Sequence, residues 1–260
     1  MIKKVLAGVI LTVLSVGALA CIYRDKLPVP NRKLWAHRCD SVEKLRLMAE
    51  KYSGLEIDAT FYDKGAHGRK FDVSHDQLWK VDYPLEDFMP TIAACDNVIW
   101  FDFKNLTHEN VSAALKELDG LLGEYGIERG RFIVESHNYE DLKPFHERGY
   151  YTAYEVPVHE SAYGEEIVRD KNFLFSNPGM VEYFCRLVRE AVSSGNVDAV
   201  SFPLTYYRMV KYADVPVEML TYDTHDENWW HFYIRGDLRT VLFDEKVRGI
   251  LVYTPTEFDR

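Results

Sequence analysis

Short runs of β-branched and aromatic residues alternate with longer amphipathic stretches from Lys33 to the end of the chain. About eight runs of each kind follow one another, and their periods of two and 3.6 residues predict strands and helices, respectively. The predicted strands are residues 34–37, 55–58, 98–104, 132–136, 151–156, 199–203, 217–222 and 250–253. The clearest predicted helices are residues 41–51, 85–94, 109–122, 139–148, 180–193 and 205–212, with Ser41 as an N-cap and Gly149 as a stop signal.

This alternation predicts the fold class. Repeated strand–helix units imply a parallel sheet, and eight of them imply that the sheet closes into a barrel. We therefore expect an α/β protein in which residues 30–260 form a single (β/α)₈ TIM-type barrel. A doubly wound open sheet is the alternative. No Gly-x-Gly-x-x-Gly motif or Walker loop opens a helix after a strand, so the usual nucleotide-binding motifs are missing.

The first 22 residues have a different character. Two lysines precede an apolar run from Val5 to Ala20, and a polar segment with two prolines follows it. This profile is typical of a signal peptide or of a short lipoprotein or membrane anchor, because the run falls below the ~20 residues that a membrane span needs. Residues 18–21 are similar to a bacterial lipoprotein processing site at Cys21; a cleaved signal with an incidental cysteine is the alternative. We expect an exported protein of the bacterial cell envelope, periplasmic or anchored through its N-terminus, or a secreted one.

Composition narrows the range of partners. Of the 260 residues, 47% are hydrophobic, which permits a large core, and 41 acidic residues against 31 basic ones give a formal charge of −10. We expect no nucleic acid partner, because binding to a phosphate backbone needs a basic surface. The four cysteines form no Cys-x-x-Cys pair, so a metal site would need other ligands. We expect a monomer.

Charged residues stand at the ends of the first three predicted strands. The first ends in His37-Arg38, the second contains Glu56-x-Asp58, and the third contains Asp102-x-Lys104. In a (β/α)₈ barrel the carboxyl ends of all strands meet at one face, where active sites are found. Side chains two residues apart on a strand point to the same side, so these charged groups should converge.

Three converging carboxylates would repel one another unless a cation lay among them. Glu56, Asp58 and Asp102 therefore predict a site for one divalent cation, and ligands that are all oxygen favour Mg²⁺ or Ca²⁺ over Zn²⁺. The alternative is a structural salt-bridge network in which Arg38 and Lys104 neutralise the same carboxylates.

Two histidines complete the candidate site. His37 ends the first strand and His75 follows the second, and a pair of imidazoles can divide the roles of general acid and general base near neutral pH. Glu135, at the end of the fourth strand, is either a substrate contact or a polar residue packed in the barrel. Further candidates at later strand ends are His137, Tyr154, Glu155, Asp223, His225 and Tyr253. Trp229 and Trp230 form either an apolar wall for a choline-like head group or part of a helix core. We interpret His67, His108, His146, His159 and His231 as ordinary surface residues.

The ordered set of His37-Arg38, Glu56-x-Asp58, His75-Asp76 and Asp102-x-Lys104 resembles the glycerophosphodiester phosphodiesterase superfamily. The resemblance covers residues 34–104 at the level of motifs and implies a phospholipase C-like phosphodiesterase barrel. It further implies a cation on Glu56, Asp58 and Asp102, acid–base catalysis by His37 and His75, and positive charge from Arg38 and Lys104 around the phosphate. We place Glu135 among the substrate-binding or phosphate-binding residues. The implied substrate is a glycerophosphodiester or a related small-molecule or lipid head-group diester.

Three departures from that pattern keep other functions open. Cys39 stands where the family has glycine. Asp102 follows His75 by only 27 positions, an interval in which glycerophosphodiesterases typically have an insertion. The aspartate at position 102 resembles the sphingomyelinase D branch, since glycerophosphodiesterases usually carry Glu there. A sphingomyelinase D-like or lysophospholipase D-like lipase is therefore one alternative. A non-catalytic envelope lipoprotein, which uses the barrel for binding or as a scaffold, is the other.

Overall fold

The computed structural model describes residues 31–63, 70–75, 82–157, 178–222 and 228–259. Everything described below belongs to the compact unit of residues 31–260. The predicted signal or anchor segment thus lies outside the described residues. Within the described ranges, no helix has both the length and the apolar character that crossing a membrane would require.

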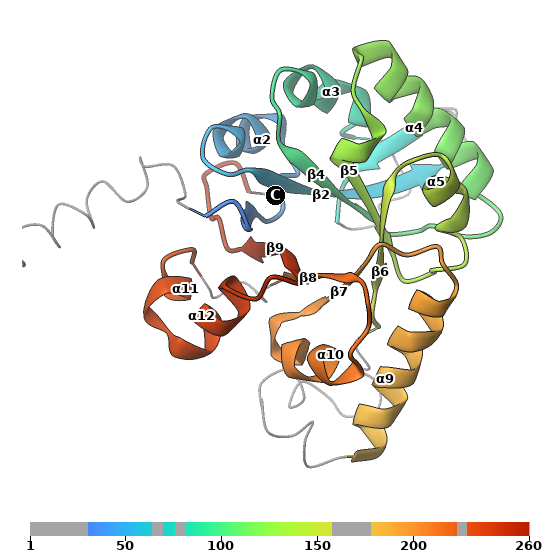
Figure 1. The fold of residues 1–260 in the computed structure, drawn as a ribbon. Helices are drawn as coiled ribbons and strands as arrows, with labels where there is room; N and C mark the ends of the chain where they lie inside the picture. The colour runs from blue at the N-terminus through green and yellow to red at the C-terminus, as the bar shows by residue number, and fades with distance from the viewer. Residues whose placement is uncertain (1–30, 64–69, 76–81, 158–177, 223–227, 260) are drawn as a thin grey trace, which may run out of the picture. The chain divides into compact units, whose positions relative to one another are not determined.

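Eight parallel strands form a closed barrel (Figure 1). In chain order they are β1 (Leu34–Ala36), β2 (Gly54–Tyr62), β4 (Val98–Phe103), β5 (Phe132–Ser136), β6 (Tyr151–Glu155), β7 (Ala199–Pro203), β8 (Glu218–Tyr222) and β9 (Val247–Val252). The ring closes because β1 pairs with β9 on one side and with β2 on the other. The predicted barrel is confirmed, and the open doubly wound sheet is wrong.

The helices surround this ring (Figure 1). They are α2 (Val42–Ala49), α3 (Leu85–Ala93), α4 (Val111–Tyr125), α5 (Lys143–Glu147), α9 (Pro178–Ser193), α10 (Tyr207–Ala213), α11 (His231–Ile234) and α12 (Gly236–Leu242). The hydroxyl of Ser41 accepts a hydrogen bond from the Lys44 backbone at 3.2 Å and caps α2 as predicted. Gly149 has a φ of 91° just after α5, which explains the stop. The short helices α11 and α12 were not among the clearest predicted helices.

One strand outside the barrel was also missed. β2 continues past the predicted segment to Tyr62, and its end pairs antiparallel with β3 (Lys70–Val73). β3 is held by Phe71, which is fully buried and packs against Phe101 and Phe103 with ring centroids 5.2 and 5.3 Å apart. Beyond β3, the backbone N–H of Ser74 donates to the carbonyl of Asp58 at 3.1 Å. The β3 strand therefore brings the next residue, His75, near Asp58 in the middle of β2.

A layer of apolar side chains fills the barrel interior below the candidate site. Seven strands contribute one residue each to it: Trp35, Trp100, Ile133, Ala153, Ala199, Leu220 and Leu251. β2 contributes Gly54, where a Cβ atom would lie 2.3 Å from Cδ2 of Trp35. Trp35 and Trp100 meet edge to face with centroids 6.1 Å apart. Because this layer closes the barrel from below, the next inward-facing residues form the floor of its open end.

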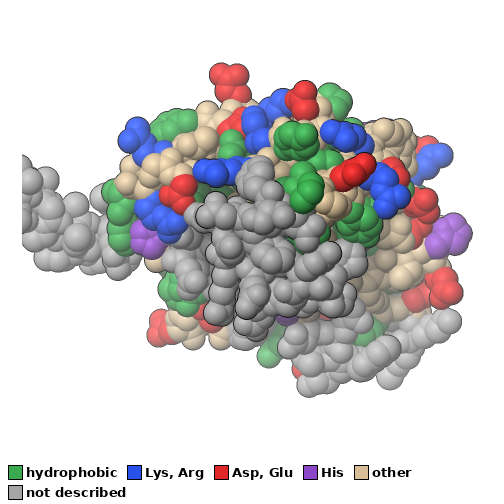
Figure 2. Space-filling view, turned by 90° about the horizontal axis from the view of Figure 1, so that it is seen from below, with side chains coloured by type: hydrophobic (Ala, Val, Ile, Leu, Met, Phe, Trp, Pro, Cys, Tyr) green, Lys and Arg blue, Asp and Glu red, His purple; other side chains and the backbone are tan. Residues whose placement is uncertain are grey.

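One face of the molecule is mixed in charge. On the face shown in Figure 2, the described acidic and basic side chains are interspersed with apolar ones.

Candidate active site

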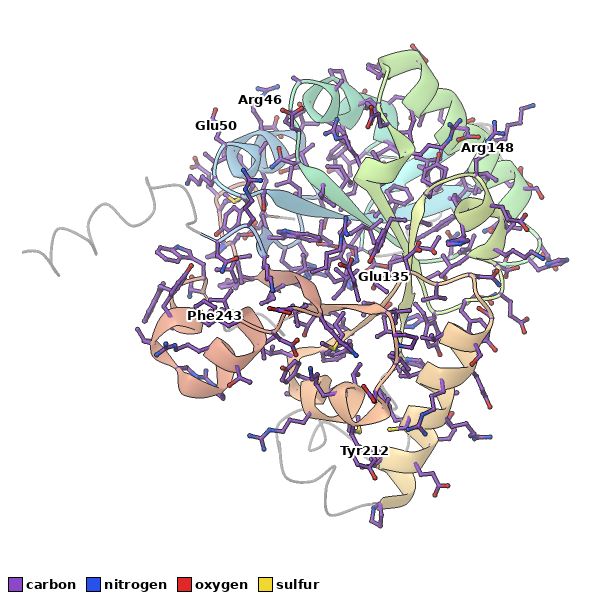
Figure 3. All side chains as sticks on the ribbon, in the orientation of Figure 1. Arg46, Glu50, Glu135, Arg148, Tyr212 and Phe243 are labelled. Carbon is purple, nitrogen blue, oxygen red and sulfur yellow. The ribbon has the colours of Figure 1, made fainter. Side chains whose placement is uncertain are left out.

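The polar floor of the barrel follows from the period of two along each strand. Glu56, Asp102, Glu135 and Glu155 each stand two residues after a member of the interior layer or after Gly54, and so they point into the barrel. Figure 3 labels Glu135 near β6, the strand with which β5 pairs. The sheet register places Asp102 beside Asp58 on β2 and beside Glu135 on β5. The barrel thus gathers carboxylates from β2, β4, β5 and β6.

The three predicted metal ligands come together. Glu56, Asp58 and Asp102 each offer a carboxylate oxygen, and these oxygens lie within 4.8 Å of one another. Glu56 and Asp58 are 1% exposed, and the side chain of Asp102 is 13% exposed. A compact set of buried oxygen ligands is the environment that Mg²⁺ and Ca²⁺ prefer.

Burial and mutual repulsion shift the pKa values of these carboxyls. Burial and the neighbouring charge of Asp58 hold the pKa of Glu56 well above its usual range. Burial also raises the pKa of Asp102 to about 8, with Glu155 and Asp58 adding to the rise, although Lys104 opposes it. Asp58 behaves differently: burial disfavours its ionisation, but Lys104 outweighs burial and lowers the pKa of Asp58 to about 2. Without a cation, the set is therefore only partly ionised at neutral pH.

The salt-bridge network that sequence offered as an alternative is present as well. Nζ of Lys104 lies 2.7 Å from Oδ1 of Asp58 and also donates to Oδ2 of Asp102. Nε of Arg38 lies 3.7 Å from Oδ2 of Asp58. These two cationic side chains do not balance the inward carboxylates, which number five once Glu135 and Glu155 are counted with the predicted ligands. The residues of the site therefore fit a divalent cation in addition to the network.

The turn after β1 wraps around Glu56. Arg38 has a φ of 53°, in the left-handed region, and its backbone N–H donates to Oε2 of Glu56 at 2.5 Å. The N–H of Cys39 donates to the carbonyl of Glu56 at 2.8 Å. The residue that carries the unusual φ is thus Arg38 rather than Cys39, whose thiol is buried and has its pKa raised by burial. The turn fixes Glu56 and directs Arg38 toward Asp58.

Both predicted catalytic histidines lie beside this cluster. Nε2 of His37 is 3.9 Å from Oε2 of Glu56, and the side chain of His37 is 15% exposed. His75 is exposed at the end of the β3 segment, where its charge contributes to lowering the pKa of Asp58. His37 therefore lies beside Glu56 just after β1, and His75 lies near Asp58 just after β3.

The remaining residues singled out in the sequence lie in different places. Glu135 and Glu155 face the barrel interior, and His137 pairs with Glu155 through Nε2 at 3.0 Å. Tyr154 was wrong as a strand-end candidate, because it points outward and packs edge to face against Tyr139. Asp76, Asp223, His225, His67 and His159 lie outside the described residues. Tyr253 lines a cavity beside His37. Trp229 and Trp230 are half-buried just before α11.

Three polar residues of the site were missed by sequence reasoning. Asp40, in the turn after β1, accepts a hydrogen bond from the backbone N–H of Asp58 at 3.0 Å. Ser201 and Tyr222 face the interior from β7 and β8, and the hydroxyl of Tyr222 donates to Oε1 of Glu155 at 3.1 Å. Extending the period of two along every strand would have found Ser201 and Tyr222. Asp40 carried no signal, because a polar residue between a strand and a helix N-cap is ordinary.

Comparisons with known proteins support the fold. No family model matches the sequence, and no curated protein matches it either. Among solved structures, a glycerophosphodiester phosphodiesterase from Parabacteroides distasonis ATCC 8503 is 14% identical, with a TM-score of 0.54, 85% of this chain covered and 92% of that one. A structure described as a glycerophosphoryl diester phosphodiesterase from Agrobacterium tumefaciens str. C58 is 12% identical, with a TM-score of 0.56; the match covers 85% of this chain and 93% of that one. An Oleispira antarctica phosphodiesterase in complex with the product sn-glycerol-3-phosphate is 12% identical, with a TM-score of 0.54 and coverages of 86% and 93%. The chain has the barrel fold of these structures, so the resemblance carried by its motifs is confirmed at the level of the fold.

Proposed function

We propose that this protein is a metal-dependent phosphodiesterase that cleaves a glycerophosphodiester or a related phospholipid head-group diester. The observation that carries the proposal is the convergence of Glu56, Asp58 and Asp102 within 4.8 Å at the carboxyl ends of the barrel strands. Two cationic side chains and two histidines flank these carboxylates. The same fold in the Oleispira protein holds sn-glycerol-3-phosphate, a product of this class of reaction.

Glu56, Asp58 and Asp102 would hold the cation, Mg²⁺ or Ca²⁺. When bound, such an ion polarises a phosphoryl oxygen and neutralises the charge that develops on it. Arg38 and Lys104 would bind the phosphate. Their side chains are 33% and 22% exposed and so reach the open end of the barrel. Arginine and lysine placed at a phosphoryl group stabilise the transition state electrostatically. Glu135, which we also predicted as a substrate-binding or phosphate-binding residue, is more deeply buried in the barrel than Arg38 and Lys104 and is only 1% exposed.

His37 and His75 serve as the acid–base pair. One imidazole accepts the proton of the attacking hydroxyl, which belongs either to water or to the substrate itself, and the other donates a proton to the leaving alkoxide. Attack by a substrate hydroxyl would give a cyclic phosphate first. Nε2 of His37 lies 3.9 Å from Oε2 of Glu56, which places this imidazole beside the proposed cation ligands.

The cellular setting is proposed from the sequence alone. The predicted N-terminal signal or anchor places the enzyme outside the cytoplasm of a bacterium, in the envelope or secreted, with any membrane association through the N-terminus. The substrate would then be a small-molecule or lipid diester found there, and the barrel would act as a monomer.

The deciding experiment measures hydrolysis of glycerophosphocholine, of a lysolipid and of a chromogenic diester by chelator-treated protein, with and without Mg²⁺ or Ca²⁺. We expect metal-dependent cleavage, and we expect His37→Ala, His75→Ala and Glu56→Gln each to lower the rate roughly 10²- to 10⁴-fold. His108→Ala is the matched control, because that ring is 97% exposed and pairs with Asp141 instead. Cleavage of the lysolipid alone would point to the lipase alternative. No cleavage of any diester with either metal would support the scaffold alternative.

A further inference from the structure

A second carboxylate cluster lies on the far side of Asp102 from Asp58. Asp102, Glu135 and Glu155 each offer an oxygen, and these oxygens lie within 4.8 Å of one another. They stand on three neighbouring strands, since Asp102 pairs with Glu135 across β4 and β5, and Glu155 lies two residues beyond the partner of Glu135 on β6. Asp102 therefore belongs to two groups of three carboxylates.

An uncharged side chain independently points into this second cluster. Ser201 is completely buried on β7, two residues after Ala199 of the interior layer, and so it faces the barrel interior. The sheet register pairs Ser201 on β7 with Glu155 on β6, so the serine lies beside the cluster. Within the described part of the chain, neither the Ser201 hydroxyl nor Oε2 of Glu135 has a hydrogen-bond partner. Buried polar atoms without a partner are costly, so a ligand for them is expected at this point.

Glu155, the third carboxylate of this second cluster, is oriented by two neighbouring side chains. Glu155 receives hydrogen bonds from Tyr222 at Oε1, at 3.1 Å, and it pairs with Nε2 of His137 at Oε2, at 3.0 Å. Each carboxylate oxygen has a second lone pair, so these contacts leave coordination sites free. Carboxylates that bind metals are typically oriented by such hydrogen bonds.

The charge of the barrel floor also calls for more than one cation. Five carboxylates face inward, and Arg38 and Lys104 are the cationic side chains beside them. One divalent cation would still leave the floor negative before a phosphodiester, itself an anion, arrived. A second divalent cation would offset this remaining negative charge, which favours the binding of an anionic phosphodiester.

We propose that Asp102, Glu135, Glu155 and the hydroxyl of Ser201 bind a second hard divalent cation, Mg²⁺, Mn²⁺ or Ca²⁺, with Asp102 shared between the two sites. The proposal rests on the proposed function only through Asp102, and it changes the role of Glu135 from phosphate contact to cation ligand. In a two-cation site, one ion neutralises the attacking oxygen and the other the leaving oxygen.

The test counts bound ions. Chelator-treated protein is dialysed against Mn²⁺, and bound Mn²⁺ is measured per chain, together with the electron paramagnetic resonance spectrum. We expect two Mn²⁺ per chain with a spin-coupled spectrum for the wild type, and one uncoupled Mn²⁺ for Glu135→Gln. Glutamine keeps the shape of the side chain and removes a repelling charge, so this variant should fold, which thermal melting checks. Glu147→Gln is the control, because Glu147 is 66% exposed on α5, and it should bind two Mn²⁺.

The outcomes separate this inference from the proposed function. One Mn²⁺ in both the wild type and Glu135→Gln, with hydrolysis intact, overturns the second site and leaves the phosphodiesterase proposal standing. Two uncoupled Mn²⁺ that both persist in Glu135→Gln also overturn it, because the second ion then lies elsewhere. No bound Mn²⁺ and no hydrolysis would overturn both.

Discussion

The ammonium group of Lys104 lies 2.7 Å from Oδ1 of Asp58 and also donates to Oδ2 of Asp102, so that it bridges two of the three proposed metal ligands. Both carboxylates raise the pKa of Lys104, although burial opposes the rise, and its charge is therefore permanent. A bound divalent cation would compete with Lys104 for the same oxygens. We infer that Lys104 has two roles: it neutralises the carboxylates in the absence of metal and contacts the phosphate in its presence.

Replacement of Lys104 by methionine should separate these roles. In metal-free protein the variant leaves Asp58 and Asp102 buried without their partner, and we expect a loss of roughly 3 kcal/mol in the free energy of unfolding. Saturating Mg²⁺ should restore most of that loss, because the cation takes over the neutralisation. Activity should stay roughly 10² to 10³-fold below the wild type, since the phosphate contact is not restored.

Urea unfolding with chelator or with Mg²⁺ measures the first effect, and initial rates on a phosphodiester measure the second. Lys143→Met is the control, because its ion pair with Glu147 is exposed at both ends. It should change the free energy of unfolding by no more than about 0.5 kcal/mol under either condition. A Lys104→Met protein that is equally destabilised with and without Mg²⁺ would show that no cation reaches Asp58 and Asp102.

The raised pKa of Asp102 predicts an unusual dependence of stability on pH. Its folded-state value of about 8 lies above the ordinary value of 3.8, so the folded protein retains a proton that the unfolded chain releases. Stability of the metal-free protein should therefore fall as the pH rises from about 4 to 8, by at most about 1.4 kcal/mol per pH unit for each such carboxyl. Asp58 has the opposite sign: its lowered pKa, about 2, adds stability that is lost as the pH falls below about 4.

Thermal melting of chelator-treated protein across this range tests the prediction, and we expect maximal stability near pH 4 to 5. Mg²⁺ should flatten the decline toward pH 8, because it binds the ionised carboxylates. A metal-free protein whose melting temperature rises steadily between pH 5 and 8 would contradict the assignment of repelling, buried carboxylates.

Much of this fold could be predicted because the signals are periodic. The alternation of strands and helices identified all eight barrel strands, and the charged residues at the first three strand ends identified Glu56, Asp58, Asp102 and Lys104. Both patterns are local in sequence, and the barrel topology makes the strand ends meet.

What was missed depends on contacts that are distant in sequence. β3 was not recognised, because four residues carry little pattern and their stability comes from Phe71 packing on β4 residues. Ser201 was missed because the period of two was not extended along β7; its neighbour in the sheet, Glu155 on β6, is 46 positions away in the sequence. The left-handed φ of Arg38 is likewise imposed by the bond to Glu56 rather than by residue type.

Substitutions of Arg38 can separate the effect of its left-handed backbone on stability from the effect of its guanidinium on activity. A non-glycine residue in the left-handed region costs roughly 1 kcal/mol, which glycine avoids. We expect Arg38→Gly to keep or slightly raise the stability of the protein, while its rate of phosphodiester cleavage falls about 10²-fold through loss of the guanidinium near Asp58. Arg38→Ala should lose a similar amount of activity with no gain in stability. If Arg38→Gly retained full activity, the guanidinium would have no role at the phosphate.

The last prediction concerns the layer beneath the site. A Cβ atom at Gly54 would lie 2.3 Å from the Trp35 ring, a distance that real Cβ contacts essentially never show. Because Trp35 is itself packed against Trp100, the ring has no free space to move into, and we expect Gly54→Ala to lower the free energy of unfolding by about 3 kcal/mol. Gly120→Ala is the matched control: it lies in α4 with nothing within 4 Å of its added Cβ, and it should raise stability by about 0.5–1 kcal/mol through helix propensity. Urea unfolding of the two variants measures the change in the free energy of unfolding, which should be a decrease for Gly54→Ala and an increase for Gly120→Ala. Equal effects of the two substitutions would mean that Trp35 does not fill the barrel at β2, and that the floor of the site is not fixed by the apolar layer below it.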